Sequence, residues 1–84
     1  MKVYTATYYY DWTVATDVYT SAEERDAAVR AWILGILKED FSKDELEDLK
    51  ITDDIKLARL EELVSENDLL GEFLYGMFEH DLAA

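Results

Sequence analysis

The sequence predicts an α+β fold in which an N-terminal antiparallel β-hairpin packs against three to four α-helices, in the order ββαααα. Two observations support this prediction. β-Branched and aromatic residues alternate through the first nineteen positions, and serine-led capping patterns then precede apolar residues at helical spacing. The length of 84 residues suits a single domain covering residues 1–84. Half of the residues are hydrophobic, which is enough to form a core without disulfides.

The first two elements are expected to be strands on either side of Asp11. Both stretches alternate between two side-chain sets and contain neither Pro nor Gly, which indicates an antiparallel hairpin. An odd-length loop centred on Asp11 is the preferred register, because it keeps the apolar set on one face. That face would carry Tyr4, Ala6, Tyr8, Trp12, Val14 and Val18. The opposite face would carry Val3, Tyr9 and Tyr19, and an exposed apolar patch there would indicate contact with another protein.

The third element is expected to be an amphipathic helix over residues 22–39. Ser21 and Glu24 form a capping box at its start. An apolar stripe then recurs at positions i, i+3, i+4, i+7 and i+8. The stripe consists of Val29, Trp32, Ile33, Ile36 and Leu37. We expect this stripe to pack on the hairpin.

Up to three further helices follow. Ser42 and Glu45 form a second capping box, which predicts a short helix ending near Lys50. Thr52 is expected to open a third helix, and Ser65 a fourth. The fourth segment contains two glycines, each of which costs about 1 kcal/mol relative to Ala inside a helix. Its apolar residues nevertheless recur at helical spacing: Leu69, Leu70, Phe73, Leu74, Met77 and Phe78.

The net charge of −12 is unevenly spread along the sequence. Residues 1–38 contain five acids and four bases, whereas residues 39–84 contain fifteen acids and four bases, a net charge of −11. Residues 39–54 alone hold eight carboxylates and two lysines. Such a negative field repels nucleic acid and anionic membranes and attracts basic surfaces.

Several classes of protein are disfavoured by what the sequence lacks. There is no cysteine, no apolar run long enough to span a membrane and no signal-peptide pattern, so a soluble cytoplasmic protein is expected. The three serines Ser21, Ser42 and Ser65 fit helix caps better than nucleophiles. His80 is the only histidine, and it is expected to be a cation near a helix C-terminus rather than a metal ligand. We therefore expect no enzyme activity, no catalytic residue, no cofactor and no dedicated metal site.

The aromatic residues of the hairpin raise the alternative of base stacking. Tyr8, Tyr9, Tyr10 and Trp12 could form a stacking platform, but such platforms need a basic groove beside them. Lys2 is the only Lys or Arg before Arg25. Core and hairpin packing is therefore the better interpretation, and no direct binding of nucleic acid is expected.

The acidic residues after position 39 are the candidate partner-binding site. On a helix, Asp40, Asp44 and Glu47 or Asp48 would share one side, with steps of about 6 Å. This spacing is similar to that of two phosphates along one DNA strand, about 3.4 Å of axis each. The alternative is a solvated surface that only maintains solubility. The residues predicted to act as phosphate surrogates are Asp40, Asp44, Glu45, Glu47, Asp48, Asp53 and Asp54.

In its small size, lack of cysteine, acidic helices and ββα-type core, the chain resembles the small proteins that bacteriophages and mobile elements encode against host defence. These include anti-CRISPR proteins and DNA-mimic anti-restriction proteins. The resemblance implies stoichiometric inhibition without catalysis, through occupation of the basic nucleic-acid-binding surface of a CRISPR–Cas effector. The alternative is an antitoxin or adaptor that covers a basic partner through shape and apolar contacts. A monomer or a homodimer is expected, and no membrane partner.

Overall fold

The computed structural model describes residues 1–10, 13–70 and 74–81. Its elements follow in the order β1, β2, α1, α2, α3, β3. The chain divides into two compact units, one formed by residues 1–28 with 72–84 and the other by residues 29–71. Helix α1 (Ala22–Asp40) contributes residues to both units. The α+β class and the N-terminal hairpin are confirmed, whereas the ββαααα order is wrong at its last element.

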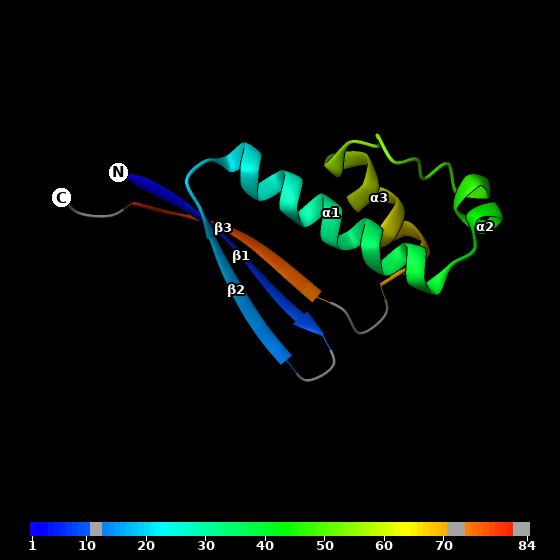
Figure 1. The fold of residues 1–84 in the computed structure, drawn as a ribbon, viewed down its shortest axis with the longest axis horizontal. Coiled ribbons are helices and arrows are strands. Elements are labelled where there is room, and N and C mark those ends of the chain that lie inside the picture. The colour runs from blue at the N-terminus through cyan, green and yellow to red at the C-terminus, as the bar shows by residue number, and fades with distance from the viewer. Residues whose placement is uncertain (11–12, 71–73, 82–84) are drawn as a thin grey trace. The chain divides into compact units, whose positions relative to one another are not determined.

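The first unit is built on a three-stranded antiparallel sheet. Strands β1 (Lys2–Tyr10), β2 (Thr13–Tyr19) and β3 (Leu74–Asp81) are arranged in the order β2-β1-β3, so the first strand is central (Figure 1). The pairing of β1 with β3 runs from Lys2 opposite Asp81 to Tyr9 opposite Leu74. The two ends of the sequence therefore meet in one sheet.

Strand β3 replaces the predicted fourth helix. Ser65, expected to begin that helix, lies inside α3 (Leu57–Asn67), and the chain leaves α3 through Asp68, whose φ of 50° is left-handed. Leu74 and Phe78, whose spacing suggested one buried helical stripe, are 62% and 52% exposed on the strand. The spacing of the apolar residues there fits both the helical period of 3.6 residues and the strand period of two. Glycine disfavours a helix in this segment, and pairing with β1 provides hydrogen-bond partners for its backbone.

The hairpin register differs by one residue from the predicted one. Tyr8 lies opposite Ala15 and Tyr4 lies opposite Tyr19, so Val14 and Val18 lie on the other face of the sheet from Tyr4, Ala6 and Tyr8. Two residues separate the paired Tyr10 and Thr13, an even number, whereas the prediction assumed an odd-length loop. The predicted positions of Asp11 and Trp12 lie outside the described residues.

The sheet face that carries Tyr4, Ala6 and Tyr8 is buried at the centre of the sheet. Ala6 is fully buried and Tyr8 is 6% exposed. Burial, and then a hydrogen bond with Tyr19, raises the pKa of the Tyr8 phenol above its ordinary value. The guanidinium of Arg25, near the start of α1, lies 5.3 Å from the centre of the Tyr4 ring. Its Nη1 also donates to the carbonyl of Phe78 at 3.0 Å, which links α1 to β3.

The second unit has a helical core. It contains the later part of α1, then α2 (Lys43–Asp48) and α3, and the predicted first helix is confirmed within one residue. Apolar residues of the helices and their connections are buried: Val29, Ile33, Leu34, Leu37, Leu46, Ile51, Ile55, Leu60, Leu63, Val64 and Leu70.

The segment between α2 and α3 is not helical, although a helix is predicted from Thr52 onward, and it is held in place by hydrogen bonds from Arg30. The guanidinium of Arg30 donates to the carbonyls of Ile55 and Asp53, which fixes this segment against α1. Helix α3 begins at Leu57, later than the predicted start at Thr52. The Thr52 hydroxyl instead donates to the Asp54 carboxylate at 2.7 Å within a local turn.

Among the described residues, no helix combines the length and the apolar character that crossing a membrane requires.

The difference between Leu60 and Leu57 tests the helical core. Leu60 is fully buried, whereas Leu57 on the same helix is only half-buried. We expect Leu60→Ala to lower the free energy of unfolding by about 2–5 kcal/mol, because the cavity left behind cannot fully close. Leu57→Ala should cost clearly less. Urea unfolding followed by circular dichroism measures both, and equal losses would contradict the described core.

Candidate functional site

Helix α2 is positioned by a complete capping box at its start. The backbone N–H of Glu45 donates to the Ser42 hydroxyl at 3.2 Å, and the backbone N–H of Ser42 donates to Oε1 of Glu45 at 3.0 Å. This confirms the capping box read from the sequence. The Glu45 carboxylate therefore takes part in the capping box, which leaves it less available for the predicted contact with a partner.

Four other predicted site residues are exposed and unpaired. Asp40 ends α1, and Asp44, Glu47 and Asp48 lie on α2. None of their carboxylates has a hydrogen bond or an ion pair in the part of the chain that the structure describes. We refer to these four as the acidic cluster. The predicted helical row is interrupted, because α1 ends at Asp40 and α2 begins only after Ser42.

Two members of the acidic cluster stand where a helix disfavours negative charge. Asp40 and Asp48 are the last residues of α1 and α2, and α2 has no basic residue in its last turn. The C-terminal end of a helix carries partial negative charge, so carboxylates at these positions oppose the helix dipole. Folding therefore does not explain why these positions hold acids.

The remaining two predicted residues have partners within the chain. Nζ of Lys38 lies 2.5 Å from Oδ1 of Asp53, and the hydrogen bond and charge of this lysine lower the pKa of the Asp53 carboxyl. The hydrogen bond from the Thr52 hydroxyl lowers the pKa of the Asp54 carboxyl in the same direction. These carboxylates stabilise the local turn and are less free to meet a partner.

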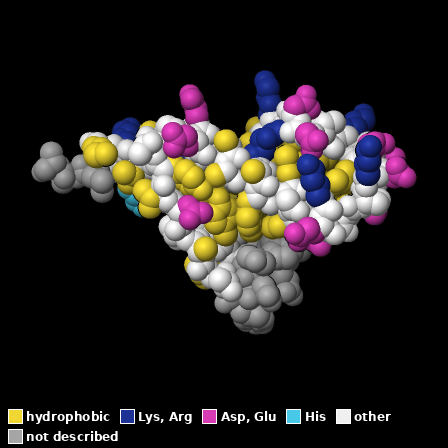
Figure 2. All heavy atoms as spheres, in the orientation of Figure 1, with side chains coloured by type: hydrophobic (Ala, Val, Ile, Leu, Met, Phe, Trp, Pro, Cys, Tyr) yellow, Lys and Arg dark blue, Asp and Glu magenta, His cyan; other side chains and the backbone are white. Residues whose placement is uncertain are grey.

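The excess charge is divided between the two units rather than collected in one. Residues 29–71 hold twelve acids and six bases, and residues 1–28 with 72–84 hold eight acids and two bases, so each unit has a net charge of −6. The sequence suggested that the negative charge collects in the second half of the chain. The structure divides it evenly, because the segment after residue 71 belongs to the same unit as the hairpin. On the face shown in Figure 2, Lys and Arg side chains lie among the acids over the helices of residues 29–71. Exposed carboxylates without a described partner also occur outside the acidic cluster, for example those of Asp17 and Glu66.

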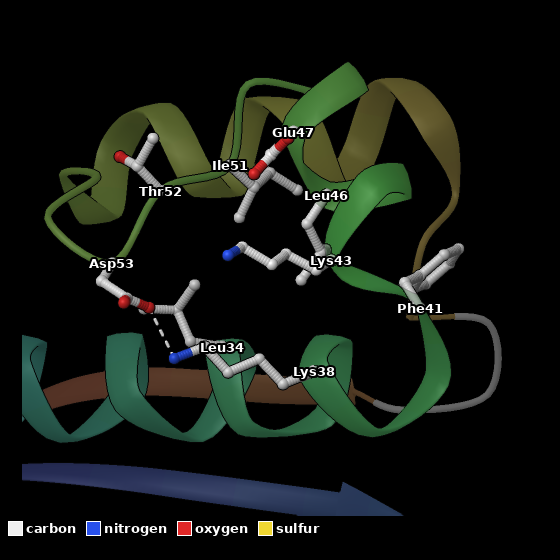
Figure 3. Close-up of a pocket in the computed structure, with 9 residues that line it drawn as sticks. All are labelled: Leu34, Lys38, Phe41, Lys43, Leu46, Glu47, Ile51, Thr52 and Asp53. Carbon is white, nitrogen blue, oxygen red and sulfur yellow. Dashed lines mark ion pairs between the residues drawn. The ribbon is translucent and has the colours of Figure 1, made fainter.

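A cavity of about 410 Å³ adjoins the acidic cluster within the second unit. It is lined by Leu34, Lys38, Phe41, Lys43, Leu46, Glu47, Ile51, Thr52 and Asp53. Figure 3 shows the Lys38–Asp53 ion pair at one side and the Lys43 side chain extending into the space from α2. Aliphatic side chains thus lie beside the free carboxylate of Glu47. Sequence reasoning missed this cavity, because residues from three separate segments form it.

His80 is not the helix-end cation that the sequence suggested. It lies on β3, where its Nε2 is 3.1 Å from the Thr5 hydroxyl and its ring is 6.4 Å from that of Phe78. Within the described ranges, no group of three potential ligands from His, Cys, Asp and Glu is close enough to hold a metal ion.

A second surface that sequence reasoning largely missed lies on the sheet. Apart from Met1, every large hydrophobic side chain that is exposed in the described residues lies on one sheet face: Tyr9, Val14, Val18, Leu74 and Phe78. Tyr9 was expected there, whereas Tyr19 lies on the opposite face together with Tyr4. An even-length hairpin loop would have placed Val14 and Val18 correctly.

Comparison with protein-family models, with curated proteins and with solved structures finds no significant match.

Substitution of the α2 cap tests how the acidic cluster is positioned. Ser42→Ala should lower the free energy of unfolding by about 1 kcal/mol, because the N–H of Glu45 loses its acceptor. Ser65→Ala is the matched control, since Ser65 is exposed within α3 and Ala favours helix. It should leave stability unchanged or slightly raised in chemical denaturation. Equal losses in the two variants would show that Ser42 does not act as a cap.

The Lys38–Asp53 pair predicts a pH dependence with a definite sign. Because the pKa of the Asp53 carboxyl is lower in the folded chain, its ionised form contributes stability above its ordinary pKa. That contribution is lost as the pH falls through the lower folded value. Asp53→Asn should therefore be destabilised at pH 7 at low salt, with the difference from the unsubstituted chain disappearing in acid.

The control for this measurement is Asp40→Asn, since the Asp40 carboxylate has no intramolecular partner in the described residues. Thermal unfolding of both variants between pH 7 and pH 2 provides the comparison. A loss in Asp53→Asn that stays constant across this range would contradict the role given to Lys38.

Proposed function

We propose that the chain is a non-enzymatic inhibitor that docks the acidic cluster on the basic nucleic-acid-binding surface of a host defence complex, in the manner of a DNA-mimic anti-CRISPR protein. The observation that carries this proposal is that Asp40, Asp44, Glu47 and Asp48 are exposed and have no partner in the described chain. Charges left unpaired in this way attract a basic surface at long range and raise the rate of encounter.

The position of these charges supports binding over simple solubility. A solubilising acid can stand anywhere on the surface, whereas Asp40 and Asp48 occupy helix C-termini that disfavour them. Glu45, Asp53 and Asp54, by contrast, serve the fold through Ser42, Lys38 and Thr52, as described above. The predicted set of seven thus separates into four carboxylates offered to a partner and three that hold their supporting structure.

The neighbouring cavity supplies a place for a partner side chain. An arginine from a basic surface can lay its aliphatic stem along Leu46 and Ile51 while its guanidinium reaches the carboxylate of Glu47. A buried anchor of this kind contributes more binding energy than charges at the rim of an interface. Lys43, which extends into the same space, would have to turn outward to admit it (Figure 3).

A second candidate function is an antitoxin or adaptor that covers a basic partner through shape and apolar contacts. It is favoured by the exposed hydrophobic side chains on the sheet, including Tyr9 and Phe78. The two candidates differ in salt dependence, since screening weakens contacts between exposed charges and leaves apolar contacts intact.

Charge reversal in the acidic cluster tests the proposal. The triple variant Asp44→Lys, Glu47→Lys and Asp48→Lys keeps Glu45, so the capping box remains. We expect it to lose inhibition of DNA cleavage by the susceptible member of a panel of purified CRISPR–Cas effectors. Inhibition by the unsubstituted chain should weaken strongly between 50 and 300 mM salt, consistent with charge screening over about 8–10 Å.

The control changes three exposed carboxylates on other elements by the same charge. Asp17→Lys, Glu24→Lys and Glu66→Lys together should keep inhibition, and circular dichroism should show that both triple variants fold. Two results would overturn the proposal: inhibition that survives reversal of the acidic cluster, or equal loss in both variants. Binding that is insensitive to salt and lost on Tyr9→Ala would favour the second candidate.

A further inference from the structure

The exposed face of the sheet has a regular composition. Three rows cross the strands, each with one residue from β2, β1 and β3: Val18, Thr5 and Phe78; Thr16, Thr7 and Gly76; Val14, Tyr9 and Leu74. The two outer rows are rich in bulky apolar side chains, and the middle row holds small ones. A Cβ added to Gly76 would lie 2.8 Å from the Phe78 ring, so this ring lies over the glycine and against the sheet. We refer to these nine residues as the neutral face.

The neutral face carries no carboxylate, although the chain has twenty acids in 84 residues. The acids of the described strand residues all lie on the opposite side: Asp17 pairs with Ala6, Glu79 with Tyr4 and Asp81 with Lys2. Among the described residues of these strands, His80 at the margin is the only ionisable side chain besides Tyr9 on this side of the sheet. A molecule of net charge −12 therefore presents an uncharged apolar surface at this place.

The threonine hydroxyls of the neutral face all have hydrogen-bond partners within the chain. The hydroxyls of Thr7 and Thr16 are 3.1 Å apart and form a hydrogen bond across the strands. The Thr5 hydroxyl is paired with His80 at 3.1 Å. Covering these threonines therefore costs less than burying three hydroxyls that have no partner. The Tyr9 hydroxyl has no partner in the described residues and would need one across the interface or in solvent.

We propose that the occupant of the neutral face is a second copy of this chain, packed sheet on sheet in a two-fold symmetric dimer. The nucleic-acid-binding surface invoked above is basic and polar, which makes it a poor match for this face. A second copy presents the same uncharged face and holds its strand carboxylates on the far side. Isologous packing of one patch on itself is also the commonest way in which soluble proteins form dimers.

The dimer should be weak and should respond to salt in a characteristic direction. The nine residues of the neutral face are fewer than the roughly 20–30 residues per side of a standard interface. Two copies of net charge −12 repel each other, and salt screens this repulsion. Self-association should therefore tighten as salt increases, which is opposite to the response expected of docking on a basic partner.

Sedimentation velocity of the purified full chain, from about 10 µM to 1 mM, tests this proposal. Val14→Lys and Ala15→Lys form a matched pair. They are adjacent and exposed on β2, and they add the same charge to opposite faces of the sheet. We expect Val14→Lys to weaken self-association by on the order of tenfold or more, because the lysine would have to be buried without a partner. Ala15→Lys should dimerise as well as the unsubstituted chain, since added positive charge lowers the repulsion.

The outcomes separate the proposal from its competitors. A dimer that tightens severalfold between 50 and 500 mM salt and is lost only in Val14→Lys supports it. A chain that stays monomeric at every concentration and salt level would overturn it, and so would equal loss in both variants. A dimer that weakens with salt would indicate ion pairing at another surface and would also overturn it. Circular dichroism of both variants establishes that each is folded.

Discussion

The pairing of β1 on both of its edges is the constraint from which the rest of the first unit follows. Once β2 and β3 take their register on this central strand, alternate side chains must lie on opposite faces. Ala6 and Tyr8 are thereby buried, and Tyr9 is placed among exposed apolar neighbours. The same register sends the strand carboxylates to one side and leaves the other uncharged. One choice of register thus produces both a packed face and a surface with the character of an interface.

Local signals in the sequence predicted local structure well, and the errors arose where distant segments decide. The Ser42–Glu45 capping box and helix α1 depend on neighbours in the chain, and both appear as expected. The identity of residues 74–81 depends on β1, whose paired residues lie 65 to 79 positions earlier in the chain, and apolar spacing alone fits helix and strand equally. The hairpin register depended on whether one or two residues form the loop, a distinction that reverses every side chain. Composition alone identified the exposed acids. Which of them have partners within the chain became clear only from the positions of Lys38 and Thr52 in the structure.

The two units expose surfaces of opposite chemistry. In residues 29–71, the four carboxylates of the acidic cluster have no described partner, and one of them, that of Glu47, lines a cavity together with aliphatic side chains. In the strand unit, hydrophobic side chains are exposed on a face whose threonine hydroxyls bond to one another or to His80. An acidic surface attracts partners over a distance but binds weakly on its own, whereas an apolar surface binds only on contact. A small chain that carries both can use one for a foreign basic partner and the other for itself.

The closure of the sheet by β3 also has a consequence for folding during synthesis on the ribosome. The helical unit of residues 29–71 is contiguous in sequence, so its local contacts can form while the chain is still being extended. Strand β1, although synthesised first, has only β2 as a neighbour until residues 74–81 emerge. During that interval the free edge of the hairpin is open to pairing with other nascent chains. The two acids of β3, Glu79 and Asp81, and the high overall negative charge discourage such encounters until the sheet is complete.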